Sequence, residues 1–205
     1  LSPEKFPDWT GLRGQEWFLK AQELAQAKRF FHWELEFPEA FQGESRGFDV
    51  VIGNPPYIRD RLQETCADNA VLAVLFESAF QKYDIYALFV EKSINVLSQK
   101  GRFGFIIPNK IMAARYALPL RKLILSKTSI SQIIDVSEIG VFKNISVYPI
   151  LLLLERNNDA RDKRFKFVKI SSLMNNETMS FPDWTFIDQN TYLSTPDNMF
   201  ISALN

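Results

Sequence analysis

The sequence predicts an α/β fold that contains a partial doubly wound, Rossmann-like sheet. Short apolar segments that end at Gly or Pro alternate along the chain with segments of helical periodicity. The expected order is strand, helix, strand, helix, strand, strand, over residues 48–53, 85–98, 102–107, 115–126, 130–136 and 146–156. Only a short loop separates the last two strands, which favours an antiparallel pair. We therefore expect a mainly parallel sheet with a C-terminal antiparallel hairpin.

The remaining elements follow from local patterns. Residues 11–30 carry apolar side chains at helical spacing and predict a helix. Residues 30–37 (FFHWELEF) alternate loosely and are rich in aromatic residues, which favours a strand or an extended approach to one. The short apolar segment 48–53 (FDVVIG) is typical of a parallel strand covered on both faces. Residues 70–80 predict another helix, and the wide apolar arc of 85–98 predicts that this helix packs on the sheet.

Composition narrows the class of protein. The 205 residues are 46% hydrophobic with no formal net charge, so we expect a globular chain without a global basic surface for nucleic acid. Cys66 is the single cysteine, which excludes a disulfide framework within the chain and favours a reducing cytoplasm. The longest apolar run, 148–154, is too short to cross a bilayer, and no signal peptide is found, so no membrane association is expected. No metal site is expected either.

The composition changes near residue 157. The segment 157–167 (NNDARDKRFKF) is charged, and the tail that follows is rich in Asn, Ser and Thr. We place a domain boundary here, with one domain over residues 1–156 and the start of a second module over residues 157–205. Because neither end of the sequence carries an obvious cap, we expect the chain to be a piece of a longer protein.

The first predicted strand runs directly into Asn54-Pro55-Pro56-Tyr57, at the kind of strand end where open α/β sheets bind ligands. The side-chain oxygen of Asn54 and the main-chain oxygen of Pro55 offer two acceptors, and Pro56 keeps Pro55 extended. Two converging acceptors suit a planar NH2 group, and Tyr57 offers a flat ring to lie against the ring that carries it. Hydrogen bonds from both amine hydrogens to these acceptors localise the nitrogen lone pair. The amine then only has to be oriented toward an electrophile in order to react. An ordinary strand-to-loop turn is the alternative.

Several segments carry a family resemblance. GNPPYI after FDVVIG resembles motif IV of the amino-group DNA methyltransferases that use S-adenosylmethionine. In the same order, FHWELEFPEAF, YDIYALFVEKS, GRFGFIIPNKIM and GVFKNISVYPILLLLER resemble the Eco57I-type adenine-specific (N6) methylase domain of type II and IIG restriction–modification enzymes. The resemblance covers about residues 30–156. It implies a partial methyltransferase catalytic domain over residues 1–156, with a helical N-terminal segment, and the start of a target-recognition region over 157–205.

The resemblance also implies roles for particular residues. Asn54 and Pro55 are expected to accept hydrogen bonds from the N6 amine of adenine, Pro56 to fix the turn, and Tyr57 to stack on the base. Phe142 in GVFKNISV matches the aromatic residue on the other face of the base, with an ordinary core contact as the alternative. The adenine has to be flipped out of double-stranded DNA to reach such a pocket. The implied activity is methyl transfer from S-adenosylmethionine, in a prokaryotic restriction–modification system that includes an endonuclease.

Two further sets of residues are candidate contacts. Glu36 in ELEFP matches the acidic position that contacts the adenine of the cofactor, with a solvated strand-edge carboxylate as the alternative. Arg161, Lys163 and Arg164 belong to a basic cluster that is expected to contact the DNA backbone, with a solvated linker as the alternative.

The sequence departs from the family upstream of Asn54. Nothing in residues 1–47 matches the Gly-containing cofactor loop, of the type Phe-x-Gly-x-Gly, or the acidic residue that closes the next strand. We therefore expect the isolated chain to be inactive, to bind S-adenosylmethionine poorly or not at all, and to depend on the rest of its parent chain. The missing neighbouring strand leaves residues 48–53 with an unpaired edge, covered by residues 30–38, by loops, or by self-association with another copy.

Two other functions stay open. Glutamine-amide and guanine-N2 methyltransferases share motifs like NPPY, although FHWELEFPE and the module after residue 157 argue against them. The chain could also be a non-catalytic DNA-recognition or scaffold piece, which the absent cofactor loop favours. The sequence upstream of Leu1 would separate these hypotheses, because a strand followed by a Gly-rich loop supports the enzyme.

Overall fold

The computed structural model describes residues 11, 13–43, 46–58, 66–140, 147–157, 163–170 and 183–200. The chain forms two compact units, Leu1–Ala40 and Phe41–Asn205. Each unit is described by itself below.

The first unit is helical. Helix α1 spans Glu16–Lys28, within the helix predicted for residues 11–30, which is thus confirmed. Glu16 in its first turn and Lys28 in its last turn complement the helix dipole. The apolar side chains of Trp17 and Leu24 are exposed, and no residue of α1 is buried.

The strand predicted for residues 30–37 is wrong, because Trp33–Glu36 forms the short helix α2. The backbone N–H of Phe37 donates to the Trp33 carbonyl oxygen at 2.9 Å, and the two rings stack with their centroids 5.9 Å apart. A strand would place side chains four residues apart at a distance of about 13 Å. The ring pair therefore fits a helical turn and excludes an extended segment. Helix α3, Pro38–Phe41, follows directly.

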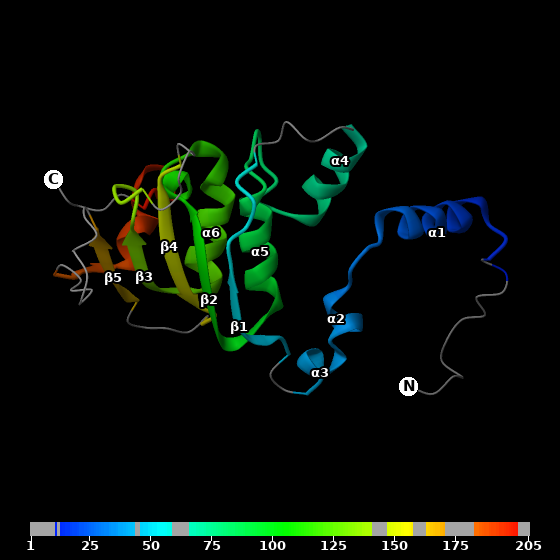
Figure 1. Cartoon of the computed structure of the whole chain (residues 1–205), viewed down its shortest axis with the longest axis horizontal. Coiled ribbons are helices and arrows are strands. Elements are labelled where there is room, and N and C mark those ends of the chain that lie inside the picture. The colour runs from blue at the N-terminus through cyan, green and yellow to red at the C-terminus, as the bar shows by residue number, and fades with distance from the viewer. Residues whose placement is uncertain are drawn as a thin grey trace. The chain divides into compact units, whose positions relative to one another are not determined.

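The second unit is built on a six-stranded sheet with the order β1-β2-β4-β3-β5-β6 (Figure 1). Strands β1, β2, β3 and β5 run in one direction, while β4 and β6 run in the other. The α/β fold class and the antiparallel pair at 130–156 are confirmed. The strands are β1 Phe48–Gly53, β2 Leu97–Pro108, β3 Ser129–Asp135, β4 Pro149–Glu155, β5 Arg164–Lys169 and β6 Thr185–Asp188.

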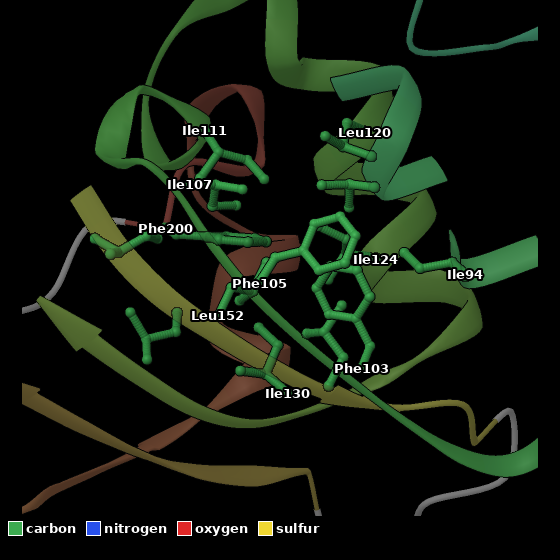
Figure 2. Close-up of a cluster of buried hydrophobic side chains, with 14 of the residues drawn as sticks. Ile94, Phe103, Phe105, Ile107, Ile111, Leu120, Ile124, Ile130, Leu152 and Phe200 are labelled. Carbon is green, nitrogen blue, oxygen red and sulfur yellow. The ribbon is translucent and has the colours of Figure 1, made fainter. Parts of the chain in front are cut away.

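Helices α5 (Tyr86–Val96) and α6 (Leu118–Lys127) pack on one face of this sheet, as the sequence predicts for the first of them. Figure 2 shows Ile94 of α5 and Ile124 of α6 beside Phe103 and Phe105 of β2 in the buried core. Short 3-10 turns follow β2 and β6: η4 Asn109–Met112, η5 Arg115–Ala117, η6 Gln189–Leu193 and η7 Pro196–Asn198. Helix α4, Cys66–Leu75, ends five residues before the predicted end at residue 80. None of the described helices is both long and apolar enough to cross a membrane.

β1 lies at the edge of the sheet and is not covered on both faces as expected. Val51 packs against the core, but Val50 and Ile52 point away from it and are 59% and 79% exposed. Further along the same face, a smaller cluster of Ile134, Val136 and Val168 is buried. Apolar composition identified the strand correctly, whereas its coverage depends on neighbours that composition does not encode.

The C-terminal strands extend the same sheet. β5 pairs in parallel with β3, and β6 pairs with β5, so the strand pairing places no break at residue 157. The boundary between the two compact units falls between Ala40 and Phe41, and the division into domains at residue 157 stays a prediction. The assignment of residues 157–205 to a target-recognition region stays a prediction.

Candidate active site

The four parallel strands β1, β2, β3 and β5 have their carboxyl ends at one end of the sheet, which we call the site edge. β1 ends there at Gly53, β2 at Pro108 and β3 at Asp135, and the oppositely directed β4 begins there at Pro149. Residues 54–57 follow β1 directly, so the structure places the Asn-Pro-Pro-Tyr turn at the carboxyl ends of the parallel strands, as expected.

Asn54 and Pro55 have different surroundings. Asn54 is exposed, and its amide makes no hydrogen bond to another described residue. Pro55 is buried, and Pro56 is exposed. Before them, Gly53 lies close to Phe105, because a Cβ on Gly53 would come within 3.0 Å of that ring. The turn therefore packs against the core through Gly53 and Pro55, while the Asn54 side chain stays accessible.

Tyr57 is anchored on the neighbouring strand. Its hydroxyl group donates a hydrogen bond of 2.7 Å to the carbonyl oxygen of Ile106 in β2, and its ring packs against the core. Burial raises the pKa of Tyr57 to about 12, so the phenol stays protonated as a donor at neutral pH. The hydroxyl group thus fixes the direction of the ring, a constraint that the sequence motif did not reveal.

The structure adds two residues to the site edge, Asp84 and Tyr116. Asp84 is buried, and the hydroxyl group of Tyr116 donates to its Oδ2 at 2.7 Å. The hydroxyl oxygens of Tyr116 and Tyr86 lie 2.9 Å apart. Burial raises the pKa of both tyrosines above their ordinary value. Asp84 lies within the segment YDIYALFVEKS, which carries part of the family resemblance, but no local pattern marks Asp84 or Tyr116 as partners at the site.

Phe142 lies outside the described residues, and its stacking role stays a prediction. The two ends of the segment that carries it are both at the site edge. The backbone N–H of Val136 donates to the Pro149 carbonyl oxygen at 3.2 Å, and that of Asn109 donates to the Tyr148 carbonyl oxygen at 2.7 Å.

Of the other predicted contacts, Lys163 and Arg164 do not lie at the site edge. Glu36 is exposed at the end of α2, in the first unit. Arg161 lies outside the described residues. Lys163 donates to the Leu125 carbonyl oxygen at 3.3 Å, and Arg164 begins β5 at the edge of the sheet opposite the site edge. Contacts of these residues with the cofactor or DNA stay predictions.

Comparison with known proteins identifies the family. Residues 5–142 match the model of the Eco57I restriction-modification methylase family. The chain belongs to this family. The type II restriction enzyme and methyltransferase RM.Eco57I of Escherichia coli is 34% identical over 113 residues, which cover 54% of this chain and 11% of that protein. The type II methyltransferase M.BstVI of Geobacillus stearothermophilus is 27% identical over 146 residues, or 70% of this chain and 23% of that protein.

A comparison of structures agrees with the fold. A protein of Listeria monocytogenes, described as a class I S-adenosylmethionine-dependent methyltransferase, superposes with a TM-score of 0.50 at 22% identity. The match covers 63% of this chain and 38% of that protein. This family member therefore has part of a Rossmann-like methyltransferase fold, and it spans less than a quarter of the length of the two relatives above.

Proposed function

We propose that this chain is the target-amine half of a DNA adenine-N6 methyltransferase from a restriction–modification system. The observation that carries the proposal is the position of Asn54, which is exposed, free of hydrogen bonds to other described residues, and directly after β1 at the site edge. Membership of the Eco57I family supports methyl transfer as the chemistry. Double-stranded DNA in a prokaryotic cytoplasm is the proposed substrate, and the rest of a longer protein is the proposed partner.

The chemistry assigned to the turn is activation of an aromatic amine. The side-chain oxygen of Asn54 and the main-chain oxygen of Pro55 each accept one hydrogen of the amine. The nitrogen lone pair is then less delocalised into the ring and points at the methyl donor. The amine can therefore react because it is correctly oriented, and no strong base is needed to activate it. Pro56 restricts the backbone of Pro55 and keeps the two acceptors in a fixed relation.

Tyr57 is assigned the capture of the flipped base. An adenine inside the duplex cannot reach a pocket at a strand end, so it has to leave the base stack. An aromatic side chain offsets part of the lost stacking, by about 1–3 kcal/mol per base. The hydrogen bond from Tyr57 to the Ile106 carbonyl oxygen supports this role, because it holds the ring before the base arrives. Phe142 is the proposed partner on the other face.

The described residues do not supply the cofactor loop. Residues 13–43, which precede β1, form helices, and none of these described residues forms a strand that leads into a Gly-rich turn. We therefore assign binding of S-adenosylmethionine to the longer protein and derive no step through it here. Glu36 stays a proposed contact with its adenine.

The deciding experiment replaces Asn54 in the longer protein that contains this chain. Asn54→Ala should abolish methylation of adenine, detected by mass spectrometry of digested DNA, while DNA affinity stays within a few-fold. Asn95→Ala is the matched control, because Asn95 is also exposed but lies in the last turn of α5, just before β2 begins at the opposite edge of the sheet. Adenine methylation retained by Asn54→Ala would refute the assigned role.

The same experiment separates the alternatives. Methyl groups found on a protein glutamine or on guanine N2 of RNA, with none on DNA, would support the other amine methyltransferases. DNA binding without methyl transfer to any of these substrates would support a recognition or scaffold piece.

A further inference from the structure

A buried hydrogen-bonded group connects the Asn-Pro-Pro-Tyr turn to the segment after β2. Tyr116 has one hydroxyl hydrogen, which it donates to Asp84. Tyr86 is therefore the donor in the second bond, to the hydroxyl oxygen of Tyr116. Since both phenols stay protonated at neutral pH and Asp84 is buried, the direction of these bonds is fixed.

Asp84 is placed next to the end of the turn. The backbone N–H of Ile85 donates to the carbonyl oxygen of Ile58 at 3.0 Å, and Ile58 directly follows Tyr57. The turn is thus held at both ends, by the pairing of β1 with β2 on one side and by Ile85 on the other. Any shift of Asp84 moves Ile85, and with it the anchor of Ile58.

Tyr116 is held in place by a fully buried arginine. Nη1 of Arg121 donates to the carbonyl oxygens of Ile111 and Ala114 at 2.9 and 2.8 Å. Its Nε and Nη2 donate to the Asp197 carbonyl oxygen at 3.2 and 3.0 Å. Two of these four bonds fix the backbone just before Tyr116, and the other two fix the guanidinium group itself on Asp197, independently of the turn.

We propose that Asp84 and Tyr116 are positioning residues, which set the placement of the Asn-Pro-Pro-Tyr turn from the rigid segment after β2. The proposal rests on the function proposed above. In this proposal, Tyr116 contacts neither the substrate nor the cofactor. Its hydroxyl group acts through Asp84, Ile85 and Ile58 on the turn that carries Asn54 and Tyr57.

The test removes one hydroxyl group from the longer protein. Tyr116→Phe deletes the bond to Asp84 and keeps the ring. The control is Ser126→Ala, which also deletes one hydroxyl donor, to the Leu123 carbonyl oxygen at 3.1 Å, but in the last turn of α6, just before the start of β3 and away from the site edge. We expect Tyr116→Phe to lower kcat by about 10- to 100-fold, since displacements of about 1 Å near a reacting group have effects of this size. Ser126→Ala should leave kcat unchanged.

A second measurement does not depend on methyl transfer. Hydrogen–deuterium exchange of peptides that cover residues 84–88 should become faster in Tyr116→Phe, because Asp84 no longer holds the neighbouring Ile85 N–H in its bond to the Ile58 carbonyl oxygen. Exchange of these peptides should be unchanged in Ser126→Ala. Should Tyr116→Phe fail to fold, Asp84→Asn replaces it. This variant keeps an acceptor but removes the charge that strengthens the bond, so a smaller change in the same direction is expected.

The outcomes are separable. A lower melting temperature for Tyr116→Phe with wild-type kcat and wild-type exchange would show a merely structural role and overturn the inference. Faster exchange in a protein whose wild type methylates no adenine would retain the link between Tyr116 and the turn and reject the proposed function instead.

Discussion

Tyr57 shows how one side chain can serve the fold and the site together. Its hydroxyl group bonds to the Ile106 carbonyl oxygen of β2, and its ring packs against the core from a position next to the two proposed acceptors. The carbonyl oxygen of Ile106 lies within a strand, so losing the phenol removes a partner from a partly buried acceptor. The hydroxyl group and the ring can therefore be tested separately.

Replacing Tyr57 with Phe should lower the free energy of unfolding of the chain by about 1 kcal/mol at neutral pH, the usual net contribution of one hydrogen bond. The pKa of Tyr57 is raised by burial to about 12, whereas an unfolded tyrosine ionises near pH 10. The wild-type advantage should be complete below about pH 10 and should disappear as the pH rises toward 12, because the unfolded state loses its proton first.

Urea unfolding of both proteins from pH 7 to pH 12 measures this difference. Methylation by the longer protein should be largely retained in Tyr57→Phe, since the ring is kept. A stability difference that stays constant up to pH 12 would contradict the role assigned to the hydroxyl group.

At the level of elements, the pairing of β1 with β2 depends on a close approach at Gly47. Gly47 has φ +132°, and a Cβ there would lie 2.5 Å from the backbone of Leu97 and Ser98. Backbone atoms cannot move aside as a flexible side chain can. The start of β1 is therefore fixed against the start of β2 by the absence of a side chain.

Gly47→Ala should lower the free energy of unfolding by about 1–3 kcal/mol, because both the positive φ and the steric contact oppose a methyl group. Gly14→Ala is the matched control, since a Cβ on Gly14 would meet no atom within 4 Å and Gly14 has no positive φ. Chemical denaturation of the two variants provides the comparison. Equal stabilities would mean that the β1–β2 contact adjusts freely.

The elements also show what the sequence could predict. Apolar segments located β1, β3 and β4 to within three residues, because local composition sets strand formation. β2 begins at Leu97, five residues before its predicted start, where the sequence predicted the end of the preceding helix. The position of β4 between β2 and β3 was not predictable, because it depends on pairing between distant segments. At residues 30–37 the alternation of aromatic residues was misleading, since Trp33 and Phe37 contact each other across a helical turn.

The candidate site also contains residues that the sequence could predict and residues that it could not. The motif placed Asn54 and Tyr57 at a strand end correctly, because the motif and the strand are adjacent in sequence. Asp84 and Tyr116 are 32 residues apart, and their hydrogen bond arises only when α5 and the segment after β2 pack together. No local pattern carries such information.

At the level of the whole molecule, β1 is an outer strand of the sheet, and no other described strand pairs with its outer side. The side chains of Val50 and Ile52 are mostly exposed there, beside a strand that pairs on one side with β2. An open strand edge with exposed apolar side chains favours pairing with another chain. We propose that the isolated chain self-associates through this edge.

Ile52→Lys should reduce this self-association, because a charged side chain on an edge strand opposes pairing. Val74→Lys is the control. Val74 is 85% exposed on α4, so this substitution introduces the same charge away from the strand. Sedimentation velocity over a range of concentrations measures both variants. A monomeric wild type, or an equal effect of the two substitutions, would reject β1 as the contact.

The pairing of β3 with β4 has a consequence for the length of the connection between them. The chain between Asp135 and Pro149 leaves and re-enters the sheet at adjacent positions, so its two ends are closed by the ladder itself. Doubling the length of such a closed connection costs only about 0.6 kcal/mol in chain entropy. Residues inserted beside Phe142 should thus be tolerated while the architecture persists.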